Sequence, residues 1–146
     1  MKYYIKKPPL GSQIDWSHPL STGIVGYWLF NEGSGNKIND ISNNRNIGTL
    51  TNFDLTTAWK SSPLGKSLDF DGSNDYINCG NKASLNFTRG VTVDIWLKAS
   101  SFAANRVIIY RGTLVFAQGD YQITQLSNTI YWRLNQDALL MSTAAP

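Results

Sequence analysis

The chain has 146 residues, a length that suits one domain with a hydrophobic core. Its net charge of +3 comes from scattered basic residues, so it lacks the basic stripe that would follow the phosphates of a nucleic acid. The single cysteine, Cys79, excludes an intrachain disulfide, and no segment approaches the ~20 apolar residues of a membrane span. We therefore expect a globular protein with no nucleic-acid and no membrane partner.

Residues 1–20 are predicted to form an extended N-terminal arm, because Pro8-Pro9 favours polyproline geometry. No apolar run follows the basic residues at the start, so we expect no cleaved signal peptide. The arm also carries apolar side chains that are predicted to anchor it to its own domain or to a neighbouring subunit. These anchors are Tyr3, Tyr4, Ile5 and Trp16.

Residues 21–146 are predicted to form a single body of short strands. Residues 67–79 give the clearest pattern, two alternating runs joined by Asp71-Gly72-Ser73-Asn74, which predicts a hairpin. In residues 91–98 the apolar side chains also occupy every second position, and residues 81–86 predict a helical turn at most. Further strands are predicted at 24–30, 47–50, 107–111, 114–117, 121–125, 129–134 and 138–141. Strands at this spacing indicate an all-β, antiparallel β-sandwich.

Four motifs between residues 23 and 100 carry a resemblance to a known family. They read Trp28-Leu-Phe-Asn-Glu-Gly-Ser-Gly35, Asp40-Ile-Ser-Asn-Asn-Arg45, Asp69-Phe-Asp-Gly72 with Asp75-Tyr-Ile77, and Thr92-Val-Asp-Ile-Trp-Leu-Lys98. In this order they resemble the laminin-G-like branch of the concanavalin A-like lectin/glucanase fold, which implies a jelly-roll sandwich. Residues 9–19 are similar to the start of laminin-G-like proteins of bacteriophages.

The chain departs from the family pattern in two places. Asn43 and Arg45 stand where the family has glycines, so we expect the loop to differ in shape. The family continues with a Trp-His-Val segment and further strands that are missing before Pro146. Either fewer strands close the sandwich, or it is incomplete at its C-terminus and is completed by a partner chain or by further residues. An incomplete sheet would expose edges that invite pairing with another chain.

Few residues could support catalysis. Glycosidases of the resembled fold use paired carboxylates, whereas this chain has a single glutamate, Glu32, in a glycine-rich loop. Its one histidine, His18, lies beside a proline in the arm. No phosphate loop, zinc spacing or nucleophile elbow occurs, so we expect no enzyme.

A structural calcium ion is the one cofactor that the sequence leaves open. The spacing of residues 69–80 excludes an EF-hand, which needs glycine at its sixth position and glutamate at its twelfth. The resemblance implies a calcium site built from loop oxygens, for which Asp40, Asn43 and Asp71 are the candidates. Turn capping is the competing role of the same residues.

Aromatic residues point to sugar binding, since their rings stack on the apolar faces of pyranoses. Trp96 shares a predicted sheet face with Asp94, and Tyr131 shares one with Arg133, which makes these four residues candidates for a ligand-binding surface. Trp59, in a predicted loop, is a ligand platform or a lid on the sandwich.

Two functions follow as hypotheses. The first is a non-catalytic surface-display protein, a phage virion decoration or fibre component docked by its arm to other subunits, with glycans as further partners. It would be made in the host cytoplasm, act on the virion surface and be part of an oligomer or assembly. The alternative is an extracellular carbohydrate-binding module cut from a secreted enzyme or adhesin.

Overall fold

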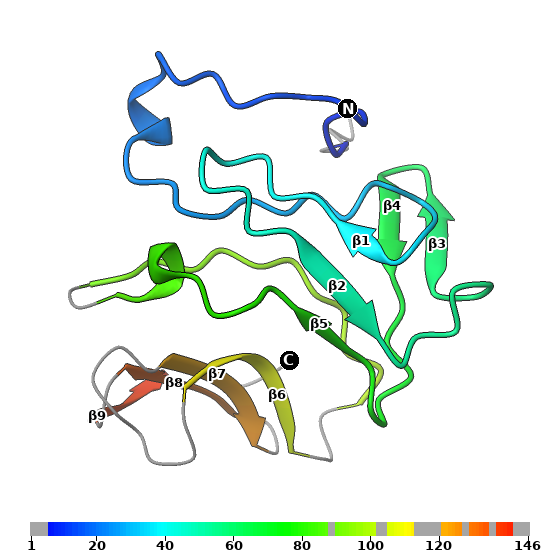
Figure 1. The fold of residues 1–146 in the computed structure, drawn as a ribbon. Helices are drawn as coiled ribbons and strands as arrows, with labels where there is room; N and C mark the ends of the chain where they lie inside the picture. Colours follow the sequence, from blue (N-terminus) through cyan, green and yellow to red (C-terminus); the bar gives the residue numbers. More distant parts are fainter. Residues whose placement is uncertain are drawn as a thin grey trace, which may run out of the picture. The chain divides into compact units, whose positions relative to one another are not determined.

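The computed structural model describes residues 6–87, 90–101, 105–112, 121–126, 129–134 and 137–141. The chain divides into two compact units, Met1–Leu85 and Asn86–Pro146. Its strands pair antiparallel throughout the described residues, and its helices are 3-10 turns of three residues (Figure 1). The predicted all-β, antiparallel class is confirmed, and the sheets are consistent with a sandwich. None of the helices in the described part of the chain has the length and apolarity that a membrane crossing requires.

The first unit contains a three-stranded sheet of very short strands. Strands β1 (Lys37–Ile38), β2 (Gly48–Thr51) and β5 (Tyr76–Asn78) lie in the order β1-β2-β5. Ile38 and Leu50 are buried and form part of the core. Gly48 is required by packing, because a Cβ there would lie 2.6 Å from Cγ2 of Ile77. Strand β2 confirms the strand predicted near residues 47–50.

Strands β3 (Trp59–Ser62) and β4 (Gly65–Leu68) form a separate hairpin in the same unit, visible in Figure 1. The hairpin predicted over residues 67–79 is therefore wrong. Its first half belongs to β4, which pairs with β3 across a two-residue turn, and its second half is β5, which pairs with β2. The residues between are a true turn, in which the amide of Ser73 donates to Oδ1 of Asp71 at 2.8 Å.

Two other predicted strands are absent. Residues 24–30 form only an isolated bridge between Trp28 and Asp40, and residues 91–98 form no strand. Alternation in a sequence shows that a segment suits a pleated surface, but a strand also needs a partner for its backbone hydrogen bonds. Among the described strands none pairs with residues 91–98.

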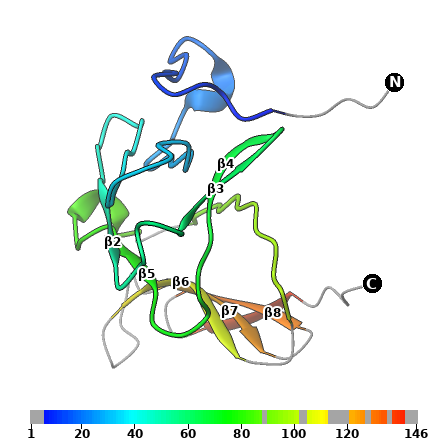
Figure 2. The ribbon, with the colours of Figure 1, turned by 90° about the vertical axis from the view of Figure 1, so that its right-hand side faces the viewer.

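The second unit contains a four-stranded sheet built from consecutive strands. They are β6 (Arg106–Arg111), β7 (Tyr121–Leu126), β8 (Thr129–Leu134) and β9 (Asp137–Met141). Figure 2 shows β6, β7 and β8 side by side, and β6 shifts register between Val107 and Ile109. All four strands were predicted, whereas the strand predicted at 114–117 lies outside the described residues.

Part of the N-terminal arm lies on its own unit. The amide of Lys7 donates to the carbonyl of Leu64 at 2.9 Å, and Nζ of Lys7 donates to the carbonyl of Lys66 at 2.7 Å. A Cβ on Gly65 would lie 3.1 Å from Cβ of Lys7, so the two backbones approach closely. Of the predicted anchors, Trp16 is 43% exposed, and Tyr3, Tyr4 and Ile5 lie outside the described residues. The extent of the arm, residues 1–20, stays a prediction.

The carboxylate of Asp40 organises the irregular part of this unit. Oδ1 accepts from the amides of Tyr27 and Ser42, each at 2.8 Å. Oδ2 accepts from the amide of Asn46 at 2.7 Å and from Oγ of Ser42 at 2.8 Å. Asp40 is only 6% exposed, so four donors replace the water that it loses on folding.

Asn46, one of these partners, extends the network. Its side chain is fully buried, and its Nδ2 donates to the carbonyl of Val25 at 3.0 Å. Its Oδ1 accepts from Oγ of Ser84, in the 3-10 turn η2 (Ala83–Leu85), at 2.8 Å. Nε1 of Trp28 donates to the carbonyl of Asn46, also at 2.8 Å. The network therefore connects segments that share no regular sheet.

The loop inside this network holds a strained residue. Arg45 has a φ of +48°, the left-handed conformation that a side chain disfavours. Its carbonyl accepts from the amide of Ile47 at 2.9 Å and from Nζ of Lys82 at 2.8 Å. The neighbouring Asn46 amide is fixed by Asp40, so the surrounding hydrogen bonds impose the conformation.

We predict that Asp40→Asn lowers the free energy of unfolding by about 3 kcal/mol. The asparagine side chain replaces one carboxylate oxygen by an NH₂ group, which is itself a donor and leaves the donors that face it without an acceptor. Chemical denaturation at neutral pH would measure this loss. Asp69→Asn is the control, since the side chain of Asp69 forms an exposed ion pair with Lys60, and its loss should change stability by less than about 1 kcal/mol. Equal losses in the two variants would contradict the role of Asp40.

The same substitution should also make the free energy of unfolding less dependent on pH under acidic conditions. Burial would raise the pKa of Asp40, but hydrogen bonds from Tyr27, Asn46 and Ser42 outweigh it and hold that pKa below its ordinary value. Its charge thus stabilises the fold above the unfolded pKa, about 3.9, and this contribution is lost as pH falls through the lower folded pKa. Unfolding free energies measured down to acid pH should fall less steeply in Asp40→Asn.

A second prediction concerns Arg45. Arg45→Gly should raise the free energy of unfolding by about 1 kcal/mol, because glycine adopts a positive φ without the penalty of a Cβ. Arg45→Ala removes the same side chain but keeps the Cβ, so its stability should stay near that of the natural chain. Thermal denaturation of the two variants separates these effects, and a gain in both would contradict the backbone strain.

Candidate functional site

The sheet of the second unit has two different faces. Residues directly opposite each other on neighbouring strands share a face, so Ile109, Ile123 and Trp132 lie on one side. The neighbouring row, Tyr110, Gln122 and Arg133, lies on the other side. The register therefore separates an apolar row from one with hydrogen-bonding groups.

Burial follows this division along β7. Tyr121, Ile123 and Gln125 are buried, at 8%, 8% and 4% exposure. The ring of Tyr121 also contacts that of Phe87, with 5.3 Å between the ring centroids. The intervening residues Gln122 and Thr124 are half-buried. Along β7, one face of the sheet is thus buried and the other is partly accessible.

We call the accessible side the open face, defined by Tyr110, Gln122, Thr124, Tyr131 and Arg133. Tyr110 is 49% exposed and Arg133 is exposed. Thr124 lies opposite Tyr131, and Nε2 of Gln122 donates to Oγ1 of Thr124. Two phenol rings among amide, hydroxyl and guanidinium groups offer both stacking surfaces and hydrogen bonds. This combination suits a ligand with an apolar face and polar edges.

The structure brings together two of the residues proposed from the sequence. Tyr131 and Arg133 lie on the open face, as their alternation predicted. Sequence reasoning missed Tyr110, Gln122 and Thr124. The alternation in β7 placed Gln122 and Thr124 on a common face, but only the register between strands shows that they lie beside Tyr131 and Arg133.

Trp96 and Asp94 do not belong to this sheet. They lie in the segment of residues 90–101, which forms no strand. Trp96 is 85% exposed and Asp94 is also exposed. The exposure of Trp96 keeps it available for a ligand, but the common strand predicted for the two residues is wrong.

Trp59 lies in the other unit, within β3 rather than in the loop predicted for it. Its ring is half-buried, and Nε1 donates to the carbonyl of Gly35 at 3.1 Å. This hydrogen bond holds the ring beside Gly35 of the same unit.

The three residues proposed for calcium occupy different surroundings. Asp40 is buried and saturated by four donors, Asn43 is exposed in the following loop, and Asp71 caps its own turn. The described part of the chain contains no group of three or more His, Cys, Asp or Glu side chains that could hold a metal. A calcium site built from amide and carbonyl oxygens stays a prediction.

Comparison with known proteins gives a likeness of fold. No protein-family model and no curated protein sequence matches the chain. Its structure is similar to the crystal structure of an S-layer domain-containing protein (residues 221–444) from Clostridium thermocellum, with a TM-score of 0.65 and 16% sequence identity. The match covers 83% of this chain but 57% of that one, so this chain spans little more than half of its length.

Neighbouring positions in β7 allow the two faces of the sheet to be tested. Ile123→Ala should lower the free energy of unfolding by about 2–4 kcal/mol, because it removes apolar atoms from the buried face. Thr124→Ala, one position along the strand, should cost less than about 1 kcal/mol. Denaturant titration of both variants is the measurement, and a larger loss for Thr124→Ala would reverse the assignment of the faces.

Proposed function

We propose that this chain is a non-catalytic binding and display module that contacts glycans through the open face. The observation that carries the proposal is the open face itself, where two tyrosines and three hydrogen-bonding side chains share one side of a sheet whose strand β7 is buried on its other side. Sugars combine apolar ring faces with a rim of hydroxyls, which such a surface matches.

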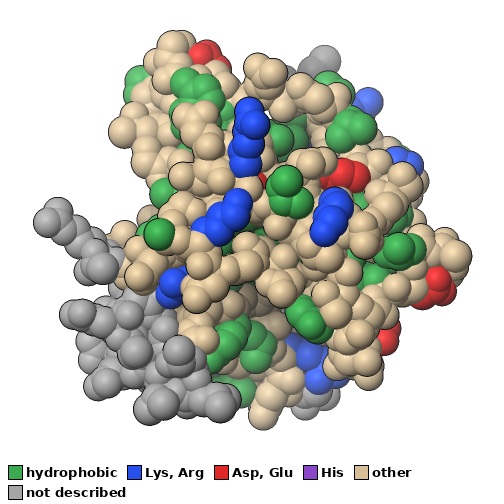
Figure 3. All heavy atoms as spheres, in the orientation of Figure 1, with side chains coloured by type: hydrophobic (Ala, Val, Ile, Leu, Met, Phe, Trp, Pro, Cys, Tyr) green, Lys and Arg blue, Asp and Glu red, His purple; other side chains and the backbone are tan. Residues whose placement is uncertain are grey.

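A location on a cell or virion surface fits this role. The S-layer domain-containing protein of similar fold supports the cell surface, and the resemblance of residues 9–19 to phage laminin-G-like proteins supports the virion. The partners would be glycans and neighbouring protein subunits of an oligomer or assembly. On the face drawn in Figure 3, basic side chains are interspersed with hydrophobic ones, which favours such partners over a nucleic acid.

The ionisable side chains also favour binding over catalysis. Asp40 is engaged by four donors, and Glu32 is the only glutamate in the chain. Burial, and to a smaller extent the charge of Asp40, raises the pKa of the Cys79 thiol, so this side chain is a poor nucleophile. We also propose membership of the laminin-G-like family and a structural calcium ion, as the sequence resemblance implies. Glycan binding by the open face requires neither of them.

A module of a longer secreted protein is the second candidate. It is favoured by the fold comparison, because the match covers 57% of residues 221–444 of the S-layer domain-containing protein, so the similar fold there lies within a longer chain. Glycan binding would be common to both candidates, so the open face is the feature to test first.

Two exposed tyrosines allow a matched experiment on a glycan array. Tyr110 on the open face is 49% exposed, and Tyr76 in the other unit is 50% exposed. Tyr110→Ala should weaken binding by about three- to tenfold, the loss expected for one stacking contact, and Tyr131→Ala should do the same. Tyr76→Ala should leave the affinity unchanged.

Circular dichroism would confirm that the three variants remain folded. No binding to any glycan, or binding that is lost in Tyr76→Ala and kept in Tyr110→Ala, would refute the proposal.

A further inference from the structure

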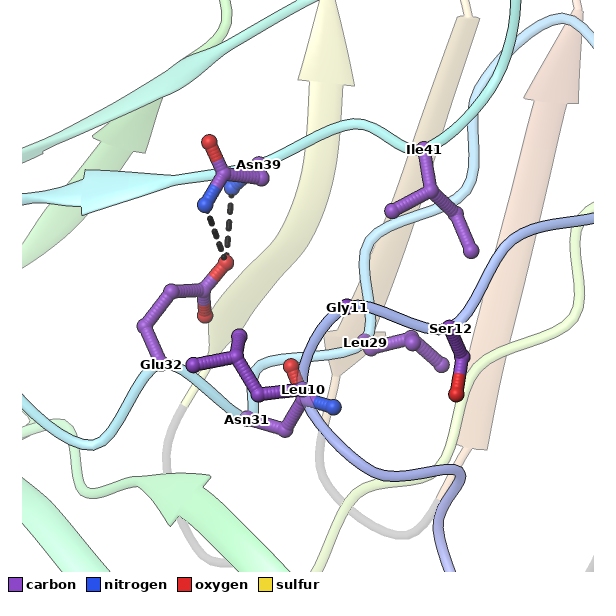
Figure 4. Close-up of a pocket in the computed structure, with 8 residues that line it drawn as sticks. All are labelled: Leu10, Gly11, Ser12, Leu29, Asn31, Glu32, Asn39 and Ile41. Atoms are coloured by element: carbon purple, nitrogen blue, oxygen red, sulfur yellow. Dashed lines mark hydrogen bonds between the residues drawn. The ribbon is translucent and has the colours of Figure 1, made fainter.

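A pocket of about 250 Å³ is lined by residues of the first unit alone, none of which belongs to the open face. Three segments line it, as Figure 4 shows: arm residues 10–12, the stretch 29–32, and residues 39–41 after β1. Sites for drug-sized ligands measure roughly 300–1,000 Å³, so this volume suits a single ring rather than an extended chain.

The charged side chain among the lining residues is Glu32, the only glutamate of the chain, and Ser12, Asn31 and Asn39 add uncharged polar groups. Oε1 of Glu32 accepts from the backbone amide of Asn39 at 2.8 Å and from its Nδ2 at 3.2 Å, the two dashed bonds in Figure 4. Oε2 of Glu32 is buried and has no hydrogen-bond partner among the described residues. A buried carboxylate oxygen is costly without a donor, so this atom calls for a donor from a bound molecule.

The remaining lining is largely apolar. Leu29 is buried at 9% exposure, and Ile41 is half-buried. Leu10 is 65% exposed, so a molecule in the pocket could cover more of its side chain. The ligand should therefore combine an apolar face with a hydrogen-bond donor.

Charge around the pocket selects a neutral donor over a cation. Lys7 is near enough to Glu32 for their charges to interact, and its Nζ is already fixed on the carbonyl of Lys66. The side chain of Lys66 passes Gly33, the residue after Glu32, with its Cε 3.2 Å from where a Cβ would stand. Nζ of Lys66 donates to Oγ of Ser61 at 2.6 Å, so Lys7 is the cation that interacts with Glu32, and a second cation in the pocket would be repelled by it.

We propose that this pocket binds one neutral sugar ring, a hydroxyl of which donates to Oε2 of Glu32 while the ring face lies on Leu10, Leu29 and Ile41. This site is separate from the open face and does not rest on it. It assigns a role to the arm as well, because residues 10–12 complete the pocket.

The single glutamate makes a direct test possible. In the full chain grown with glutamate labelled with ¹³C at the side-chain carboxyl, the signal of that carboxyl belongs to Glu32 alone. Titration with glucose, galactose, mannose and N-acetylglucosamine should shift this signal with at least one sugar, at a Kd of about 1–10 mM. Glucosamine, a cation, and glucuronate, an anion, should shift it less than the best neutral sugar.

Variants then assign the contact. Calorimetry should show that Glu32→Gln weakens binding about tenfold or more, since it replaces a charged acceptor. Leu10→Ser should also weaken it and, because Leu10 is exposed, should leave the fold intact. Asp69→Asn, which removes a negative charge from the surface of the same unit, should have no effect.

Two results would overturn the proposal: a Glu32 signal that moves with none of the neutral sugars, or one that moves most with glucosamine. Tyr110→Ala should leave the Glu32 response unchanged, so failure of the open face and failure of this pocket are distinguishable.

Discussion

The first unit depends on one buried charge. Its strands are two to four residues long, too short to fix the long connections between them. Asp40 fixes these connections instead, because its two carboxylate oxygens accept hydrogen bonds from residues 27, 42 and 46. Trp28 is fixed twice, by its bridge to Asp40 and by its hydrogen bond to the carbonyl of Asn46. The strained Arg45 directly precedes Asn46, so its backbone is fixed as well. Hydrogen bonds to a carboxylate therefore replace a ladder of paired strands.

The same anchor connects structure with function. Asn39, which orients Glu32 in the pocket, directly precedes Asp40, so the residue that fixes the loop also fixes one wall of the pocket. The second unit reaches order by another route, a four-stranded sheet of antiparallel pairs, one face of which is the open face. Both features present fixed side chains to a partner, which suits display and binding. In the first unit the buried Asp40 fixes the segment that lines the pocket, and in the second unit the buried side chains of β7 lie on the side opposite the open face.

The sequence predicted the second unit better than the first. Strands β6 to β9 were predicted as short strands at regular spacing, and each of them pairs with a neighbour in the chain. Residues 67–79 alternate but divide between two sheets, since a pattern of period two does not name the partner. For the same reason Tyr131 and Arg133 could be placed on one face, whereas Tyr110 could not be placed beside them. Nor does any local pattern reveal that Asp40 gathers donors from three segments.

Amide hydrogen exchange tests most directly whether Asp40 holds the first unit together. The amides of Tyr27, Ser42 and Asn46 donate to its carboxylate although none of them lies in a strand. If Asp40 is the anchor, these amides exchange as slowly as those of the paired strand β2. Exchange at the rate of the exposed neighbour Asn43 would show that the carboxylate does not order the loop.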